Sequence, residues 1–344
     1  MDLTKYSKKG YTGIDNLGNT CFLNSCLQVL NHTYELNEVL DKIGETIVDR
    51  QLADTSVLNE WNDLRKTMWS GNGVVSPNKF VHNIHTTAKI KGKEIFTGYA
   101  QNDMPEFLLF IIDCIHNSIS RSVTISINGN TQNGLDELAI KCYSMLKTVY
   151  TKEYSEIMDL FFGIYMSIIT NKDGTHNISI KPEHYFILDL PIADNTNTIY
   201  ECFDLFMKSE LLEGDNGLID EKTGVKQDVN KQIYFWNFPK ILTVCLKRFS
   251  ATGTHKLNNL IEFPLNDLDL SKYIKGYHPA SYKYELYGVC NHIGGVMGGH
   301  YTAFIKHADN TWIHFNDSSV EIVDEPQKII TPLAYCLFYR KKII

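Results

Sequence analysis

The chain has 344 residues, of which 43% are hydrophobic and 21% are charged, and its formal net charge is −7. This composition is ordinary for a globular protein of one large domain or two smaller ones, and it excludes disorder over most of the length. The acidic balance also lacks the basic footprint of nucleic-acid binding, so we expect no nucleic-acid partner.

Nothing in the sequence points to a membrane. No apolar run reaches the roughly 20 residues that cross a bilayer, and the first five residues lack a signal-peptide core. The eight cysteines are irregularly spaced, which favours free thiols over four disulfides. No Cys-x-x-Cys pair is present, so we expect no metal site. We therefore expect a cytoplasmic protein, with access to the nucleus left open.

The first 120 residues or so are predicted to be mainly helical. Apolar residues recur at helical spacing in two segments, namely Phe22, Leu23, Cys26, Leu27 and Leu30, and then Phe107, Leu108, Ile111, Ile112 and Ile115. A third helix is predicted over residues 135–146.

After about residue 159 the pattern changes to strands rich in Ile, Phe and Tyr. The predicted strands cover residues 167–170, 184–190, 241–249, 284–291, 300–307, 312–316 and 335–340. The nearly continuous apolar run over residues 241–249 is typical of a strand covered on both faces. A helical first part followed by a mainly antiparallel sheet predicts the α+β class.

Cys21 lies in the most informative stretch, residues 11–26. Asn19 or Thr20 is suited to cap a helix whose first turn contains Cys21. The helix dipole and the free backbone N–H groups there favour the thiolate, and the Asn16 amide is placed to donate to a developing oxyanion. A single cysteine near a helix start is more often structural than catalytic, so this segment alone leaves both readings open.

His300 is the best candidate for the base that a thiol nucleophile needs. It follows a glycine-rich stretch, residues 294–299, that predicts a flexible loop able to lie against a ligand. The strand over residues 312–316 is predicted to return beside His300. It brings Asn316 and Asp317 close enough for one of them to orient the imidazole.

These segments together resemble the catalytic core of the ubiquitin-specific proteases, over residues 10–341. The matching motifs are Gly-Ile-Asp-Asn-Leu-Gly-Asn-Thr-Cys-Phe-Leu-Asn-Ser (13–25), Gln-Asn-Asp-Met-Pro-Glu-Phe-Leu (101–108), Leu-Glu-Gly-Asp-Asn (212–216), Leu-Lys-Arg-Phe (246–249), Phe-Pro-Leu (263–265), Gly-Gly-His-Tyr-Thr-Ala (298–303) and Trp-Ile-His-Phe-Asn-Asp (312–317). No single motif is decisive, but the ordered set is highly specific.

The resemblance implies a papain-like fold with a helical thumb, a β-sheet palm and β-sheet fingers that grip ubiquitin. On this reading residues 10–344 form one catalytic domain, with the thumb over residues 10–155 and the fingers and palm over residues 156–344. Residues 1–9 are then a flexible leader, and we expect a monomer. Many relatives bind zinc at the fingertips, but the corresponding residues here, 170–173 and 220–223, contain no cysteine. We therefore expect fingers without zinc.

The resemblance also assigns roles to individual residues. Cys21 is the nucleophile, His300 the base and Asn16 the oxyanion donor. Asn316 is the third member of the triad, and the adjacent Asp317 helps it by offsetting the charge of an imidazolium. The implied reaction is attack of the thiolate on the carbonyl after ubiquitin's terminal glycine, followed by hydrolysis of the thioester, without a cofactor. The residues assigned to ubiquitin binding are Gln101, Asp103, Glu106, Gly298, Gly299 and Tyr301.

Asp103 and Glu106 are three residues apart on a predicted helix and so share a face. Either this is a solvated helix face or, as the resemblance implies, the two carboxylates pair with arginines of ubiquitin's tail. Pro105 departs from the family motif. Because proline is tolerated only in a first turn, it shifts the expected helix start and the placement of Asp103.

The sequence therefore predicts a thiol-dependent deubiquitinase that cleaves thioester, amide or isopeptide bonds after ubiquitin, with ubiquitin and ubiquitinated proteins as partners. One alternative is a catalytically weak ubiquitin-binding scaffold, although such a protein would be free to lose Cys21, His300, Asn16 and Asn316. The other alternative is the same chemistry on another ubiquitin-like modifier, which a panel of modifier probes would separate.

Overall fold

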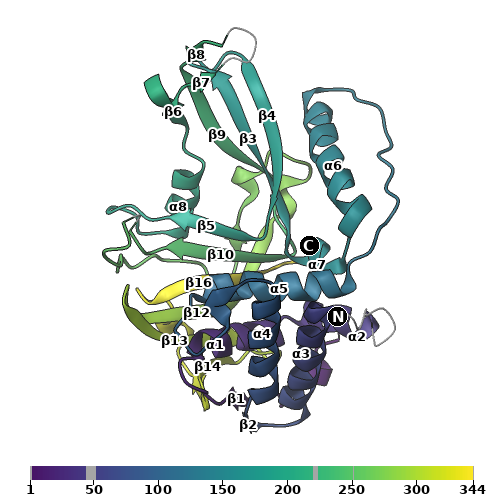
Figure 1. Cartoon of the computed structure of the whole chain (residues 1–344). Helices are drawn as coiled ribbons and strands as arrows, with labels where there is room; N and C mark the ends of the chain where they lie inside the picture. Colours follow the sequence, from purple (N-terminus) through teal and green to yellow (C-terminus); the bar gives the residue numbers. More distant parts are fainter. Residues whose placement is uncertain (1, 44–51, 220–223, 251, 344) are drawn as a thin grey trace.

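The computed structural model of the chain describes residues 2–43, 52–219, 224–250 and 252–343. Helices dominate the first part and strands the second, so the α+β prediction is confirmed. Figure 1 shows a helical base, a sheet beside it and a second sheet that rises away from both. We call these parts the thumb, the palm and the fingers.

The thumb is a group of helices around one buried helix, α1. Its members are α1 (Cys21–Asn31), α2 (Tyr34–Ile43), α3 (Ala53–Ser70), α4 (Asn78–Ile90) and α5 (Met104–Ile119), with the parallel strands β1 (Thr12–Ile14) and β2 (Gly73–Val75). The apolar spacing predicted one buried face for α1, but all eleven of its residues are buried. The reason is that α1 packs on α5 and also against the palm strands.

The palm is a sheet that lies against α1. Its strand order is β15 (Ser319–Val323), β14 (Trp312–Asn316), β13 (Gly298–Lys306), β12 (Lys283–Gly295), β16 (Ala334–Lys341), β10 (Ile241–Lys247) and β5 (Ile187–Pro191), and β11 (Leu268–Asp269) pairs with β12. The first six residues of β10 are buried, which confirms the strand predicted from the apolar run. The pairing is antiparallel except between β10 and β5.

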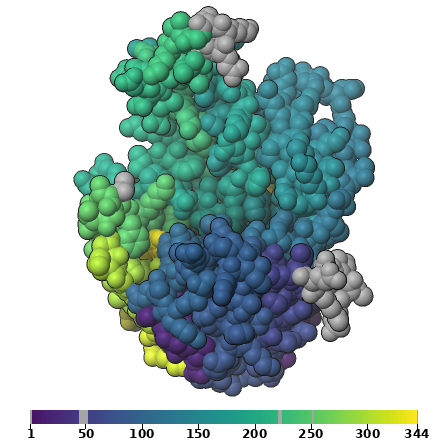
Figure 2. Space-filling view, in the orientation of Figure 1, coloured from purple at the N-terminus to yellow at the C-terminus, as the bar shows by residue number. Residues whose placement is uncertain are grey.

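The fingers are an antiparallel sheet that rises above the palm and thumb (Figure 2). The strand order is β4 (Asn177–Tyr185), β3 (Gly163–Asn171), β9 (Val229–Asn237) and β6 (Glu210–Leu212), with a separate pair β7 (Leu218–Ile219) and β8 (Lys226–Gln227). Helices α7 (Glu156–Phe161) and α8 (Ile199–Phe206) flank the base of this sheet.

Three predictions about these elements need correction. The strand predicted over residues 184–190 is two strands, because β4 pairs with β3 in the fingers whereas β5 pairs with β10 in the palm. The third helix, α6 (Gly134–Glu153), is longer than predicted, and it packs on the fingers although it falls in the predicted thumb segment. Part of the predicted leader is packed, since Thr4–Tyr6 form a 3-10 helix whose Tyr6 ring is buried against Tyr34 and Trp69.

The cysteines match the prediction of free thiols, because all eight are free and buried. Within the described ranges, no group of His, Cys, Asp and Glu side chains is arranged to hold a metal ion. Of the two fingertip segments, residues 220–223 lie outside the described residues. Among the helices that the structure describes, none has both the length and the apolar composition needed to cross a bilayer.

Candidate active site

The turn before α1 sets the position of Cys21. Cys21 is the first residue of the helix, as predicted, and is only 4% exposed. Thr20 is the N-cap residue, as one of the two predicted alternatives, but its side chain makes no cap hydrogen bond. Its hydroxyl turns back and accepts from the Leu17 N–H at 2.9 Å instead. Gly18, at a φ of +98°, supplies the left-handed backbone that this reversal needs.

The protonation of Cys21 differs from the prediction made from its helix position. Burial raises the pKa of the thiol, and the charge of Asp317 raises it further. Backbone N–H groups of Tyr301, Phe22 and Cys21 itself lower the pKa, as the helix start predicts, but burial outweighs them. We therefore expect the free protein to hold Cys21 mainly as a thiol at neutral pH.

Alkylation of Cys21 by iodoacetamide tests this state. Because the thiolate reacts, the rate should rise about tenfold for each unit of pH below the pKa of Cys21, without a plateau near neutral pH. Asp317→Asn should move the curve to lower pH, because it removes a charge that opposes the thiolate. A rate that is already flat across neutral pH would contradict this account and would indicate an ion pair with His300.

The hydrogen bond that orients His300 comes from Asn316. The two residues lie on the neighbouring strands β13 and β14, and His300 Nε2 is 2.6 Å from Asn316 Oδ1. An amide oxygen only accepts, so Nε2 carries a proton. The other ring nitrogen, Nδ1, is then unprotonated in the neutral imidazole and is the atom able to take a proton.

Asp317 is bonded to two amides instead of to the imidazole. Its Oδ2 accepts from Asn16 Nδ2 at 2.9 Å, and its Oδ1 accepts from Asn24 Nδ2 at 2.8 Å. The side-chain oxygen of Asn16, Oδ1, in turn accepts from the N–H groups of Gly18 and Thr20 at 2.9 and 3.2 Å. This fixes the Asn16 amide and leaves one of its two N–H bonds for a further acceptor. Asn24 was missed from the sequence, although it stands in the cysteine motif.

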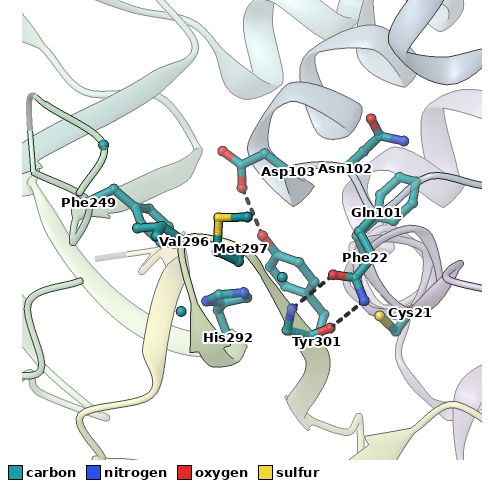
Figure 3. A pocket seen from close by; sticks show the side chains of 14 residues that line it. Cys21, Phe22, Gln101, Asn102, Asp103, Phe249, His292, Val296, Met297 and Tyr301 are labelled. Atoms are coloured by element: carbon teal, nitrogen blue, oxygen red, sulfur yellow. Dashed lines mark hydrogen bonds between the residues drawn. The ribbon is translucent and has the colours of Figure 1, made fainter. Parts of the chain in front are cut away.

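The glycine-rich stretch is a tight hairpin, where a flexible loop was predicted. Strands β12 and β13 pair as far as Gly295 and Gly298, and Gln101 fastens the hairpin to the thumb. Gln101 Nε2 donates to the Gly299 oxygen at 3.0 Å, and the Gly299 N–H donates to Gln101 Oε1 at 2.9 Å (Figure 3). Gly298 has a φ of +144°, which favours glycine, and a β-carbon there would lie 2.5 Å from Gln101 Oε1 and displace that side chain.

Asp103 and Glu106 do not act as a pair. Asp103 precedes α5 and points inward, where it accepts from the hydroxyls of Tyr301 at 2.9 Å and Tyr335 at 3.0 Å. Burial raises the pKa of Asp103, against the opposing effect of these two hydrogen bonds. Glu106 is exposed on the first turn of α5, and Pro105 sits beside it in that turn, where proline is tolerated.

A pocket with a volume of about 380 Å³ lies between thumb and palm, and its lining includes Cys21, Gln101, Asp103, Gly298, Gly299 and Tyr301. His300, Asn16, Asn316 and Glu106 are not among its lining residues. In Figure 3, Cys21 lies at one end of the pocket and Phe249 at the other. Sequence reasoning assigned no part in the site to Phe249, His292 or Met297, all of which line the pocket. His292 is 4% exposed, and burial lowers its pKa to about 4, so its imidazole is neutral at neutral pH.

The chain is similar to several known proteins. The family profile described as ubiquitin carboxyl-terminal hydrolase matches residues 12–339. Ubiquitin carboxyl-terminal hydrolase 2 of Homo sapiens is 37% identical over 97% of this chain and 55% of its own length. Its counterpart in Gallus gallus is 34% identical over 96% of this chain and 93% of its own length. The chain thus spans about half the length of the human relative.

A similar solved structure is that of a SAGA DUB module containing Ubp8, bound to monoubiquitin. It has a TM-score of 0.75 and 26% identity to this chain, and the match covers 100% of this chain and 72% of that one.

Proposed function

The chain belongs to the ubiquitin carboxyl-terminal hydrolase family, and from this premise we propose that it is a cysteine-type deubiquitinase. It would hydrolyse the thioester, amide or isopeptide bond after the terminal glycine of ubiquitin. The observation that carries this proposal is Cys21 on the wall of a pocket whose other wall includes the strand of His300. The family match supplies the substrate class.

In the proposed mechanism, His300 Nδ1 takes the proton of the Cys21 thiol as the sulfur attacks the carbonyl carbon. The carbonyl oxygen becomes an oxyanion, and the second N–H of Asn16 donates to it. Collapse of this intermediate breaks the carbon–nitrogen bond, and the leaving amine takes the proton back from His300. Water then attacks the thioester carbon while His300 again accepts a proton. The carbon–sulfur bond breaks, the Cys21 sulfur takes the proton back from His300, and ubiquitin leaves with a free carboxylate.

The raised pKa of Cys21 fits general-base chemistry better than a resting ion pair. Asn316 orients the imidazole but carries no charge, so it offers little compensation for an imidazolium. Proton transfer would therefore accompany attack on a bound substrate.

For substrate binding, we propose that the tail of ubiquitin occupies the pocket beside Gly298 and Gly299, which Gln101 holds in place. Tyr301 would act as part of the pocket wall. Asp103 would act chiefly through the two tyrosines that it accepts from. Glu106 is exposed and is the carboxylate left to pair with an arginine of the tail.

Glu106→Gln tests the contact with the tail. An exposed ion pair contributes about 1 kcal/mol, so KM for a ubiquitin substrate should rise roughly fivefold with kcat unchanged. Asp63→Asn, which removes an exposed carboxylate from α3, is the matched control and should leave both constants unchanged. A fall in kcat, or an equal effect of the control, would contradict the assignment.

The activity itself is tested with a panel of fluorogenic C-terminal amides of ubiquitin and of ubiquitin-like modifiers. The proposal expects turnover of the ubiquitin amide with the highest kcat/KM. A higher kcat/KM for another modifier would indicate that the enzyme performs the same reaction on that modifier instead of on ubiquitin. Binding of ubiquitin without turnover would favour the scaffold.

We also propose that the protein works as a monomer in the cytoplasm, with ubiquitin and ubiquitinated proteins as partners. Eight buried free thiols support a reducing compartment. The monoubiquitin bound to the similar structure supports ubiquitin as the partner.

A further inference from the structure

We propose that Asn24 is a positioning residue for the reaction, which acts by holding Asp317 and, through Asp317, the amide of Asn16. This inference rests on the proposed function. Asn24 is a buried residue of α1 that does not line the pocket and takes no direct part in the proposed reaction.

The side chain of Asn24 extends from α1 toward two segments beside the site, residues 14–15 and Asp317. Its side chain is 2% exposed, and its Nδ2 lies 2.8 Å from Asp317 Oδ1, 3.2 Å from the Asp15 oxygen and 3.3 Å from the Ile14 oxygen. The bond to Asp317 is the shortest of the three and joins a donor to a charged acceptor, which makes it the strongest. One amide thus ties α1 to the end of β1 and to the turn after β14.

The backbone of this turn is already fixed, so what Asn24 controls is the direction of the carboxylate. The backbone carbonyl oxygen of Asp317 accepts from the Ile14 N–H at 2.9 Å, and Asp317 has a φ of +51°. A β-carbon on Gly13 would lie 2.4 Å from the Ser318 oxygen, which shows how closely β1 approaches the turn. Within that frame, the carboxylate is held by one amide on each oxygen.

The carboxylate contributes to the direction of the second N–H of Asn16, together with the N–H groups of Gly18 and Thr20 that hold the Asn16 side-chain oxygen. Asp317 Oδ2 takes one N–H of Asn16 at 2.9 Å, so rotation of the carboxylate rotates the amide or breaks that bond. Oxyanion donors work because they are fixed before charge develops. Without Asn24, the carboxylate would also face the oxygens of Ile14 and Asp15 with no donor between them, and it would turn away from both.

Gln28 offers a matched control one turn further along α1. It is 1% exposed, and its Nε2 donates to the Thr12 oxygen at 2.8 Å. Like Asn24, it has a side-chain oxygen without a hydrogen-bond partner among the described residues. Asn24→Leu and Gln28→Met therefore remove similar buried amides from one helix, but only Asn24→Leu removes a hydrogen bond to Asp317.

The test combines turnover of the fluorogenic ubiquitin amide with alkylation by iodoacetamide, which forms no oxyanion. Asn24→Leu should lower kcat about 10- to 100-fold, a part of the loss expected for a whole oxyanion donor. KM should stay within about twofold, and the alkylation rate should not fall. Gln28→Met should leave all three values near those of the wild type. In an Asn16→Ala background, Asn24→Leu should cause little further loss, because the two residues act through one donor.

Several results would overturn the proposal. These are full additivity with Asn16→Ala, an equal loss in Gln28→Met, or a parallel loss of alkylation, each of which indicates a general structural effect. If Asn24→Leu does not fold, Asn24→Asp replaces it. Its kcat should fall, and adding Asp317→Asn should recover part of the loss by restoring a donor–acceptor pair, whereas a further fall would contradict the proposal. A wild type without turnover would instead remove the proposed function, and this role with it.

Discussion

Replacing Cys21 by alanine is expected to abolish turnover of a ubiquitin substrate while leaving ubiquitin binding intact. The nucleophile acts as a unit with its base, and removal of either member of such a unit costs on the order of 10⁴- to 10⁶-fold in kcat. Binding should persist because the hairpin, Gln101 and the pocket walls do not depend on the sulfur. Rates from the fluorogenic amide and affinity by calorimetry measure the two effects separately.

Cys26 provides the matched control for this experiment. It lies on the same helix, is fully buried and is free, and burial raises its pKa well above that of an ordinary thiol. Cys26→Ala should lower the melting temperature, since it removes buried volume, but keep kcat within about twofold. Loss of turnover in Cys26→Ala, or its survival in Cys21→Ala, would contradict the assignment of the nucleophile.

Replacing His300 by alanine is expected to have an effect of similar size. Because the thiol of Cys21 is buried and its pKa is raised, the proposed attack depends on a base that removes the proton. kcat should fall on the order of 10⁴-fold or more. The residual rate should rise with pH, since hydroxide then has to form the thiolate.

His314 is the control for this variant. It lies on β14 beside the His300 strand, and its ring contacts that of Phe304 with 4.6 Å between the ring centroids. Among the described residues it forms no hydrogen bond to the catalytic groups. His314→Gln should leave kcat nearly unchanged. Addition of free imidazole should partly restore the turnover of His300→Ala. Failure of both expectations would contradict the assignment of His300 as the base.

The sequence was sufficient for those parts of the site that depend on local order. The strand Trp312–Asn316 has its predicted bounds, and it meets β13 through a short turn, so the contact between His300 and Asn316 follows from hairpin register. The start of α1 at Cys21 likewise follows from the preceding turn.

Contacts between distant segments could not be predicted in this way. The partners of Asp317 are Asn16 and Asn24, which are 301 and 293 residues away in sequence, and local register cannot specify that approach. Local sequence also gives no measure of the burial that raises the pKa of Cys21, because α1 is covered by both α5 and β13. The inward turn of Asp103 depends on two tyrosines of the palm strands.

The fold shows the same division. Residues 184–190 have an unbroken strand pattern, and nothing within them indicates that one half pairs in the fingers and the other in the palm. The packing of α6 on the fingers is also a tertiary contact, formed by side chains such as Cys142 against Met166 and Trp236.

The central claim is tested most directly by trapping the nucleophile with ubiquitin that carries a C-terminal propargylamide. Intact mass spectrometry should show one ubiquitin added per chain, and peptide mapping should place the new bond on Cys21 and on none of the other seven cysteines. An adduct on another cysteine, or no adduct from a protein that binds ubiquitin, would contradict the account.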